Sequence, residues 1–406
     1  MIRRNFIKNI GITGGSLLLQ SNIAKALTPF ADGRKLNVGV IGCGDRGTGL
    51  MHVMKQLPDQ YQLGMVCDVL DFRLENARKL MPAATTSKDY KKVLDNKNID
   101  AVIISVPLDM HFQIAQDALN AGKHIYLEKT MTYNIQQAIE LVNLSRSRPR
   151  QILQVGHQYR YTPLYHKVKE MINKGYLGKV TQIDCRWDRN GTWRRPVPEP
   201  SLERQINWRM YKEYSGGLPA ELLSHQIDFV NWAFDTHVDE VYASGGIDFY
   251  KDGRETYDNV QAVLRYNKDG MIGNFGATCA NSHDGYLFKF KGSKGSISLL
   301  VDQAVYYPEK KALETLHETV DGVTGATKII WDKNGGIPIE TGPLKDGSWY
   351  ALMDFHKCVS SLQQPSSNVY TGARTAITVG MINTSLFGHT IQKWTPAYDL
   401  KPPMGV

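Results

Sequence analysis

The chain has 406 residues, of which 42% are hydrophobic and 22% charged, so it is long enough for two domains and is neither disordered nor of low complexity. Its formal net charge is +8, but Arg3, Arg4, Lys8 and Lys25 lie in the first 26 residues, which contain no acidic residue. The rest of the chain carries 44 of the 48 basic residues against 40 acidic ones and has no dense basic stripe, which argues against a nucleic-acid partner.

Residues 1–26 resemble a twin-arginine signal peptide. The sequence Arg3-Arg4-Asn5-Phe6-Ile7-Lys8 precedes a moderately apolar run from Gly11 to Leu19, and Ala24-Lys25-Ala26 offers small residues before a cleavage site. The apolar run is too short to span a bilayer, so we expect no stable membrane insertion. Proteins exported by this route cross the membrane folded, which predicts a periplasmic protein that retains a preloaded cofactor. A frayed cytoplasmic N-terminus and an uncleaved anchor are the alternatives.

A nucleotide-binding pattern begins at residue 36. The apolar run 36–41 predicts a buried parallel strand that leads directly into Gly42-Cys43-Gly44-Asp45-Arg46-Gly47. Gly42 permits a tight turn, Gly44 lets the backbone approach a pyrophosphate, and Gly47 lets the next helix pack closely on the strand. The N-terminus of that helix offers unpaired N–H groups to the phosphates. We therefore expect this loop, including Asp45 and Arg46, to bind a dinucleotide.

Asp68 is placed to select the dinucleotide. It follows the apolar run Tyr61–Cys67 and lies about 20 residues beyond Gly47, where the adenosine ribose is expected. A carboxylate there accepts hydrogen bonds from both ribose hydroxyls and repels a 2′-phosphate, so the sequence predicts NAD as the cofactor rather than NADP. A helix N-cap is the alternative role of such an aspartate. The order of strand, glycines, helix, strand and acid favours the ribose.

Strands and helices alternate from residue 36 to residue 157. Further apolar runs at 101–106, 124–127 and 151–155 are separated by helical sequence at 72–80, 89–94, 112–121 and 135–146. Such β–α units predict a doubly wound parallel sheet, and we assign 36–157 to an NAD-binding Rossmann domain. Ligands bind at the carboxyl ends of these strands. The candidate cofactor-binding residues at those ends are Ser105, Pro107, His111, Glu128, Lys129 and His157.

The pattern changes after His157. A helix over 164–174 is followed by strands with period-2 alternation at 179–187, 240–247, 259–266, 272–279, 286–290 and 296–300. Consecutive alternating strands with hairpin-like links predict an antiparallel sheet. Helices at about 349–361 and 373–390 close this region. We therefore predict an α+β domain over 158–390 and a C-terminal tail over 391–406.

Two groups of residues carry candidate chemistry. Lys129, next to Glu128, is suited to stabilise a developing alkoxide. Glu221 and His225 lie four apart in a predicted helix, where a carboxylate can fix the tautomer of a histidine that acts as a general base. Asp228 is an alternative orienting carboxylate. A surface Glu-Lys pair and a histidine packed in the core are the alternative readings. Five cysteines without Cys-x-x-Cys spacing give no support for a metal site.

The segment 186–214 is rich in aromatic and basic residues. It contains Trp193, Arg194, Trp208 and Arg209. Aromatic faces stack on the C–H surfaces of sugars and arginines bind hydroxyl groups, so this segment predicts a carbohydrate subsite. A solvated loop or a dimer arm is the alternative. Base stacking on these rings is disfavoured by the near-balanced charge.

Together these motifs resemble the glucose–fructose oxidoreductase and inositol dehydrogenase family (Gfo/Idh/MocA) over nearly the whole chain after residue 26. They are Gly42-x-Gly44-x-x-Gly47, Asp68, Ser105-Val106-Pro107 with His111, Glu128-Lys129, Gly156 to Arg160, and Glu221-x-x-x-His225-x-x-Asp228. The resemblance implies an α/β Rossmann domain followed by an α+β domain with a large, mostly antiparallel open sheet, and a homo-oligomer. It also implies that Lys129 and His225 are catalytic. Glu221 stands where the family usually has Asp, and Thr130 where it usually has Pro.

We count Lys129, His225 and Glu221 as candidate catalytic residues, and Arg160, Trp193, Arg194, Trp208, Arg209 and Asp228 as candidate substrate-binding residues. The leading hypothesis is an exported oxidoreductase that holds NAD tightly and oxidises a hydroxyl of a sugar or glycoside, with His225 taking the proton and Lys129 polarising the oxygen. Since little free NAD exists outside the cytoplasm, its reaction would be redox-neutral or paired with a second substrate.

Two other functions remain open. One is an NAD-dependent glycoside hydrolase that works by transient oxidation, elimination, hydration and re-reduction, similar to the α-N-acetylgalactosaminidases of the same family. The other is a non-catalytic sugar-binding protein that contains NAD.

Overall fold

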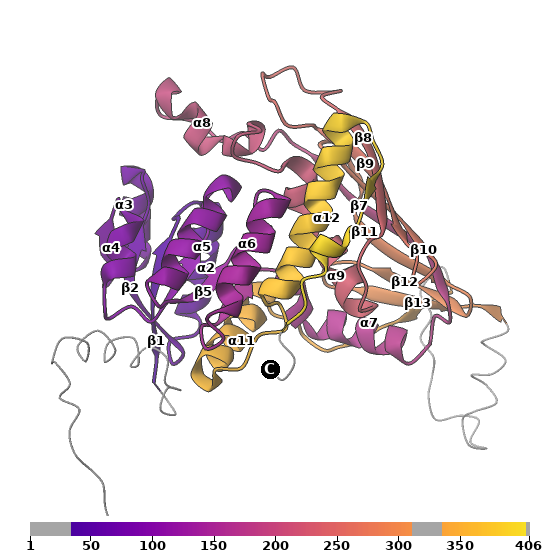
Figure 1. Cartoon of the computed structure of the whole chain (residues 1–406), viewed down its shortest axis with the longest axis horizontal. Coiled ribbons are helices and arrows are strands. Elements are labelled where there is room, and N and C mark those ends of the chain that lie inside the picture. Colours follow the sequence, from indigo (N-terminus) through magenta and orange to yellow (C-terminus); the bar gives the residue numbers. More distant parts are fainter. Residues whose placement is uncertain (1–33, 311–334, 403–406) are drawn as a thin grey trace, which may run out of the picture.

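The computed structural model describes residues 34–310 and 335–402, which form two sheets with helices packed between and around them (Figure 1). The predicted signal at 1–26 lies outside the described residues. Within the described ranges, none of the helices combines the length and the apolar character that crossing a bilayer requires.

The N-terminal domain is built on six parallel strands in the order β3-β2-β1-β4-β5-β6. Because the strand order reverses between β1 and β4, the carboxyl ends of these two strands open into a crevice. The doubly wound sheet predicted from the sequence is confirmed. The strands are β1 Leu36–Ile41, β2 Tyr61–Cys67, β3 Thr85–Ser87, β4 Ala101–Ile104, β5 His124–Leu127 and β6 Leu153–Val155. The linking helices are α2 Asp45–Lys55, α3 Asp71–Leu80, α4 Tyr90–Asp95, α5 His111–Asn120 and α6 Ile135–Arg146.

The second domain contains a nine-stranded sheet in the order β14-β13-β12-β11-β7-β10-β9-β8-β15. All neighbours pair antiparallel except β7 and β10, which run parallel. The mostly antiparallel sheet is thus confirmed. The strands are β7 Val180–Asn190, β8 Glu240–Gly246, β9 Asn259–Tyr266, β10 Met271–Thr278, β11 Ala280–Gly292, β12 Gly295–Leu299, β13 Ala304–Pro308, β14 Ile337–Pro338 and β15 Gln392–Lys393.

Helices α7 (Pro163–Asn173) and α9 (Ser224–Ala233) pack on one face of this large sheet. The ring of Phe229 on α9 lies 5.5 Å from that of Phe288 and 5.8 Å from that of Phe290, both on β11. These aromatic contacts fix α9 on the face of the sheet.

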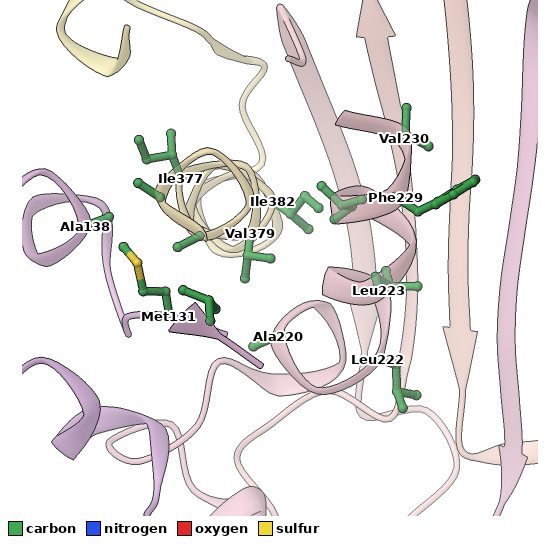
Figure 2. Close-up of a cluster of buried hydrophobic side chains, with 14 of the residues drawn as sticks. Met131, Ala138, Ala220, Leu222, Leu223, Phe229, Val230, Ile377, Val379 and Ile382 are labelled. Carbon is green, nitrogen blue, oxygen red and sulfur yellow. The ribbon is translucent and has the colours of Figure 1, made fainter. Parts of the chain in front are cut away.

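The long helix α12 (Val369–Gly388) lies between the two domains. The side chain of Asn368 caps its N-terminus by accepting hydrogen bonds from two backbone N–H groups. Figure 2 shows α12 with the labelled residue Ala138 of α6 on one side and Phe229 and Val230 of α9 on the other. Ile377 and Ile382 of α12 are fully buried in the same cluster. The helix is therefore apolar on several sides and joins the two cores.

Helix α11 (Gly347–Ser361) belongs to the core of the N-terminal domain, although it lies far outside the predicted range 36–157. Tyr61 donates a hydrogen bond to the carbonyl of Leu352 at 2.6 Å, and the ring of Phe355 lies 5.8 Å from that of Tyr126. This placement corrects the assignment of all of 158–390 to the second domain. An amphipathic pattern predicts that a helix buries one face, but it does not identify the surface that covers it.

The segment after α12 is not a free tail as far as residue 402. Strand β15 pairs antiparallel with β8 at the edge of the large sheet, and the Trp394 ring stacks on His237 with centroids 4.4 Å apart. Residues 391–402 thus extend the second domain. A two-residue strand is too short to give an alternation pattern, which is why the sequence did not predict it.

Candidate active site

A cavity of about 760 Å³ lies between the carboxyl ends of the parallel strands, strand β7 and the segment 191–215. One end is lined by the glycine loop and Asp68, and the other by Trp208, Arg209, Glu221 and His225. Lys129 also lines it. Most of the predicted cofactor residues and all three predicted catalytic residues therefore line one cavity, whereas Gly47 and His157 do not.

The glycine loop fits a bound pyrophosphate. Gly42 has φ of +94°, and a Cβ added there would lie 2.5 Å from the carbonyl oxygen of Ser105. A Cβ on Gly47 would lie 1.9 Å from the Gly42 oxygen. Helix α2 starts at Asp45 with no side chain capping its first turn, so its free N–H groups are available to phosphate oxygens.

Asp68 is buried at the nucleotide end and held in place by the backbone. One carboxylate oxygen accepts a hydrogen bond from the N–H of Cys43 at 2.8 Å, and the other from the N–H of Leu70 at 3.0 Å. Each oxygen has a second lone pair, so the carboxylate can still accept from the ribose hydroxyls of NAD. The residues present at this end fit an adenosine ribose.

Asp45 and Arg46 line the cavity but bind other side chains. Asp45 pairs with Arg195 of the segment 191–215 at 2.9 Å. The Arg46 guanidinium donates to the Glu128 carboxylate at 2.7 Å and to the Ser348 hydroxyl at 3.0 Å. Arg46 thus connects α2, the end of β5 and the start of α11 while it lines the cavity, and its contact with the cofactor stays a prediction.

Two backbone carbonyls just before α9 hold the ammonium group of Lys129. It donates to the carbonyl of Glu221 at 2.8 Å and lies 3.4 Å from that of Ala220. Thr130 donates to the same Ala220 carbonyl at 3.0 Å, a bond that the proline usual at this position in the family cannot make. Burial lowers the pKa of Lys129, and the neighbouring carboxylates of Glu221 and Glu128 oppose that shift. The result is a positioned donor at the reacting end of the cavity.

Glu221 does not orient His225 as expected. Residues Pro219–Leu223 form a single π-helical turn before α9, so Glu221 and His225 do not stack on one face as they would four apart in a regular α-helix. The Glu221 carboxylate instead accepts from Arg209 at 2.7 Å. Burial alone would raise the pKa of Glu221, but Arg209 and Lys129 hold it below its usual value. Glu221 is therefore an anion paired with Arg209.

His225 is almost fully buried among aromatic rings at the reacting end. Its ring centroid lies 4.7 Å from that of Tyr159, 5.6 Å from that of Trp187 and 6.1 Å from that of His157. Within the described residues its Nδ1 has no hydrogen-bond partner. Burial, with Lys129 nearby, lowers the pKa of His225 well below 6.5. The ring is neutral at pH 7 and can accept a proton.

Arg160, Asp228 and His157 form a buried group behind His225 and do not line the cavity. Arg160 donates two hydrogen bonds to the Asp228 carboxylate, at 2.6 and 2.9 Å, and the Nδ1 of His157 lies 3.4 Å from it. The three side chains are 1–2% exposed. The predicted contacts of Arg160 and Asp228 with substrate, and of His157 with cofactor, are therefore replaced by a structural ion pair. The periodicity of apolar residues indicates that such positions are buried, but it does not indicate which side chain each of them contacts.

Ser105, Pro107 and His111 line the cavity at the end of β4. The Ser105 hydroxyl donates to the Gly42 carbonyl at 2.8 Å. His111 is buried, with Nδ1 2.9 Å from the Thr130 oxygen and Nε2 3.1 Å from the Val106 oxygen. These residues shape the crevice, and His111 ties the end of β4 to the end of β5.

The aromatic and basic segment is divided by the fold. Trp193, Trp208 and Arg209 line the cavity. Arg194 does not, because its guanidinium binds the carboxylates of Asp252 and Glu203. Tyr159 and Trp187, which contact the ring of His225, were not singled out as site residues, although they lie in the stretch 156–160 and the segment 186–214. Trp187 lies in a predicted strand, where alternation alone does not separate a core residue from one that lines a cavity.

Both domains match models of one protein family. Residues 36–157 match the oxidoreductase family with an NAD-binding Rossmann fold, and residues 165–298 match the GFO/IDH/MocA C-terminal domain. The N-terminal domain is therefore an NAD-binding Rossmann domain, in agreement with the glycine loop and Asp68.

Relatives and solved structures extend this similarity. The chain is 26% identical over 205 residues to an inositol 2-dehydrogenase/D-chiro-inositol 3-dehydrogenase of Lactiplantibacillus plantarum, covering 50% of this chain and 53% of that one. It spans about half the length of the curated relatives it matches. Levoglucosan dehydrogenase in complex with NADH and levoglucosan superposes with a TM-score of 0.72 at 19% identity, over 89% of this chain and 99% of that one. The WlbA dehydrogenase of Bordetella pertussis in complex with NADH and UDP-GlcNAcA gives 0.72 at 20% identity, over 90% and 99%. At these identities the structures establish a shared fold.

Proposed function

The chain belongs to the Gfo/Idh/MocA family, and from this premise we propose that it is an NAD-dependent oxidoreductase acting on a hydroxyl group of a sugar or glycoside. The observation that carries the proposal is the placement of Lys129 and a neutral His225 in one cavity with the nucleotide loop. Relatives named as inositol and levoglucosan dehydrogenases support a polyhydroxylated substrate.

The chain's own residues hold the cofactor and handle the proton. Gly42, Gly44 and Asp68 would hold NAD, which would serve as the oxidant of the carbon atom that bears the substrate's hydroxyl group. His225, whose neutral ring lines the cavity, takes the hydroxyl proton. The Lys129 ammonium donates a hydrogen bond to the same oxygen and stabilises the negative charge that develops there.

Neighbouring groups position this pair. The carbonyl of Glu221 holds the Lys129 ammonium, and the Arg209 ion pair holds the Glu221 side chain. Trp187 and Tyr159 bracket the His225 ring and exclude water from it. The indole faces that line the cavity are suited to stack on a sugar ring.

The test is turnover of a panel of sugars, glycosides and inositols by the protein loaded with NAD, followed as NADH absorbance. We expect His225→Asn and Lys129→Met each to lower kcat by about 10²–10⁴-fold, because each removes a group that acts on the transferred proton or the developing charge. NAD affinity should be unchanged. His283→Asn, at a histidine whose side chain is 89% exposed, is the control. Undiminished turnover in both variants would refute the proposed roles.

The same assay separates oxidation from hydrolysis. Release of an aglycone with no net NADH would identify the redox glycoside hydrolase. Sugar binding without either product would identify a binding protein.

We also propose that the protein keeps NAD bound and reaches the periplasm by the twin-arginine route. The pair between Arg195 and Asp45, which joins the segment 191–215 to the start of α2, supports retention of the nucleotide. Denaturing the purified protein should release stoichiometric NAD and no NADP. Changing Arg3 and Arg4 to Lys should leave the protein in the cytoplasm on fractionation. Absence of nucleotide, or export without the arginine pair, would contradict these proposals.

We propose, finally, a homo-oligomer formed through the outer face of the nine-stranded sheet. Tyr242, Val263 and Ile272 lie on the adjacent strands β8, β9 and β10 and are 48%, 45% and 45% exposed. Light scattering should give an oligomer that Val263→Glu dissociates, because a charge cannot be buried unpaired at such a contact. A monomeric wild-type protein would rule this out.

A further inference from the structure

Arg189 on β7 lines the cavity without an ion-pair partner. Its guanidinium carbon lies 4.3 Å from the centroid of the Trp193 ring, over the ring face. Among residues 34–310 and 335–402, no carboxylate forms a salt bridge with Arg189. The other arginines of this end are each paired: Arg209 with Glu221 at 2.7 Å, Arg195 with Asp45 at 2.9 Å, and Arg204 with Glu213 at 2.8 Å.

The surroundings of Arg189 are electropositive. Burial lowers the pKa of Arg189 from its usual value, and the neighbouring Arg209 and Arg195 lower it further. A guanidinium does not deprotonate in proteins, so it remains a partly desolvated cation beside other cations. Such a group is costly unless an anion pairs with it. The carboxylates nearby are already bound to other arginines, which leaves this role to a ligand.

The geometry of Trp193 presents the guanidinium to a ligand. The guanidinium lies over the Trp193 ring, and its N–H groups donate no hydrogen bond to another described residue, so they are available to form two parallel bonds to an oxyanion. Trp193 adopts φ of +65°, which is rare for a bulky residue and occurs where surrounding structure enforces it, commonly at ligand sites. The pair of side chains is thus a preformed platform.

Arg189 is close to the reacting groups. It lines the same cavity as Lys129 and His225. A ligand anion on Arg189 and a hydroxyl at Lys129 can therefore belong to one small molecule.

We propose that the sugar substrate carries an anionic group, a carboxylate or a sulfate or phosphate ester, that binds to the guanidinium of Arg189. This inference rests on the proposed action on sugars and specifies the substrate class. It requires that a charged sugar bind more tightly than its neutral counterpart, and that Arg189 supply the difference.

The experiment titrates the NAD-loaded full-length protein by calorimetry with matched sugars. Methyl β-glucuronide is compared with methyl β-glucoside, and glucose 6-sulfate and glucose 6-phosphate with glucose. We expect at least one anionic sugar to bind tenfold or more tightly than its neutral partner, and Arg189→Gln to abolish that preference while NAD affinity is kept. The pair of sugars that shows the preference identifies the bound group as a carboxylate, a sulfate ester or a phosphate ester.

Arg186→Gln is the matched control. Arg186 lies on the same strand, outside the cavity, and donates to Gln261 at 3.0 Å. It should keep the full preference, and thermal melts should show that both variants fold. Equal binding of charged and neutral sugars, no binding of any charged sugar, or a preference that survives Arg189→Gln would overturn the inference. So would an Arg189→Gln effect confined to NAD affinity.

The outcomes separate this inference from the proposed function. If the protein is not an oxidoreductase, no sugar is turned over but the charge preference in binding persists. If the inference alone fails, neutral sugars are oxidised and Arg189→Gln has no effect on either turnover or binding.

Discussion

The carboxylate of Asp68 binds two backbone N–H groups and faces the nucleotide end of the cavity. One side chain therefore fixes the glycine loop through Cys43 and has lone pairs left for a ribose. Its position after a strand was sufficient to predict the ribose contact, but its hydrogen bonds to the loop depend on how close β1 and β2 lie in the sheet.

Asp68→Asn should reduce the preference for NAD over NADP by tenfold or more. The amide keeps the shape of the side chain but removes the charge that repels a 2′-phosphate, and Arg73 at 3.8 Å is then free to attract one. Binding titrations with both nucleotides measure the ratio. Asp59→Asn, at an exposed aspartate that does not line the cavity, should leave it unchanged. A variant with wild-type selectivity would remove Asp68 from the specificity site.

The buried histidines make stability depend on pH. Burial lowers the pKa of His157 to about 4 and that of His225 well below 6.5. The unfolded chain takes up these protons near pH 6.5, whereas the native rings stay neutral until the pH approaches their lower values. The free energy of unfolding should therefore fall as the pH drops from about 6.5 towards 4.

We expect a loss of about 2 kcal/mol from His157 between pH 7.5 and pH 5, and a further loss of the same sign from His225. Urea unfolding at several pH values measures it. His157→Gln should make the decline shallower, because a glutamine takes up no proton. A stability that is constant over this range would mean that water reaches the rings and solvates their charged forms.

At the scale of elements, two helical features decide the site. The π-helical turn at Pro219–Leu223 turns Glu221 towards Arg209 and its carbonyl towards Lys129. Helix α12 carries the contact between α6 and α9, and so sets the distance between the nucleotide crevice and His225 (Figure 2). The sequence predicted a helix over about 373–390, but the π turn had no signal in the four-residue spacing.

Ile382→Ala should lower the free energy of unfolding by about 2–5 kcal/mol. Ile382 is fully buried where α12 meets α9, and truncation leaves a cavity at a junction that cannot collapse easily. Denaturant melts measure the change. Thr384→Ala, at an exposed residue on the same helix, should cost far less. Equal losses in the two variants would show that α12 is not held by its buried face.

At the scale of the whole molecule, the chain returns to its first domain after building the second. Helix α11 fills the N-terminal core beside β1 and β2, and Gln154 of β6 donates to its Ala351 carbonyl at 2.8 Å. The N-terminal domain is therefore built from two parts of the chain, one before and one after the strands of the second domain. The cavity between the domains depends on α11, which packs in the N-terminal core, and on α12, which lies between the domains.

A chain limited to residues 34–157 should fail to fold cooperatively. Without α11 the apolar side chains of its core, including Tyr126 and Leu36, are left uncovered, since they pack on Leu352 and Phe355 in the complete protein. Circular dichroism melts and dye binding test this, with the full chain as reference. A sharp thermal transition in the isolated segment would mean that α11 is dispensable.

The sequence by itself determined the features that depend only on residues close together in the chain. Strand, glycine loop, helix and acid at fixed spacing specified the dinucleotide-binding domain, and alternating runs specified a mostly antiparallel second sheet. Both patterns depend on residues that are neighbours in the sequence, because backbone geometry sets the spacing of side chains along a strand or helix and the residues that a turn requires. Among the residues that line the cavity, Lys129, Glu221 and His225 were found from motifs at a strand end and in a helix, and Trp193 and Trp208 from the aromatic and basic composition of their segment.

Only the tertiary structure decided which group each charged side chain binds. Arg160 with Asp228, Arg46 with Glu128 and Glu221 with Arg209 are pairs between elements distant in sequence. These pairs bind the side chains to one another, and Arg189 has no carboxylate partner among the described residues. The physical reason is that a charge near the interior pairs with whatever partner the packing of other elements brings within a few ångströms, and local sequence does not record that distance.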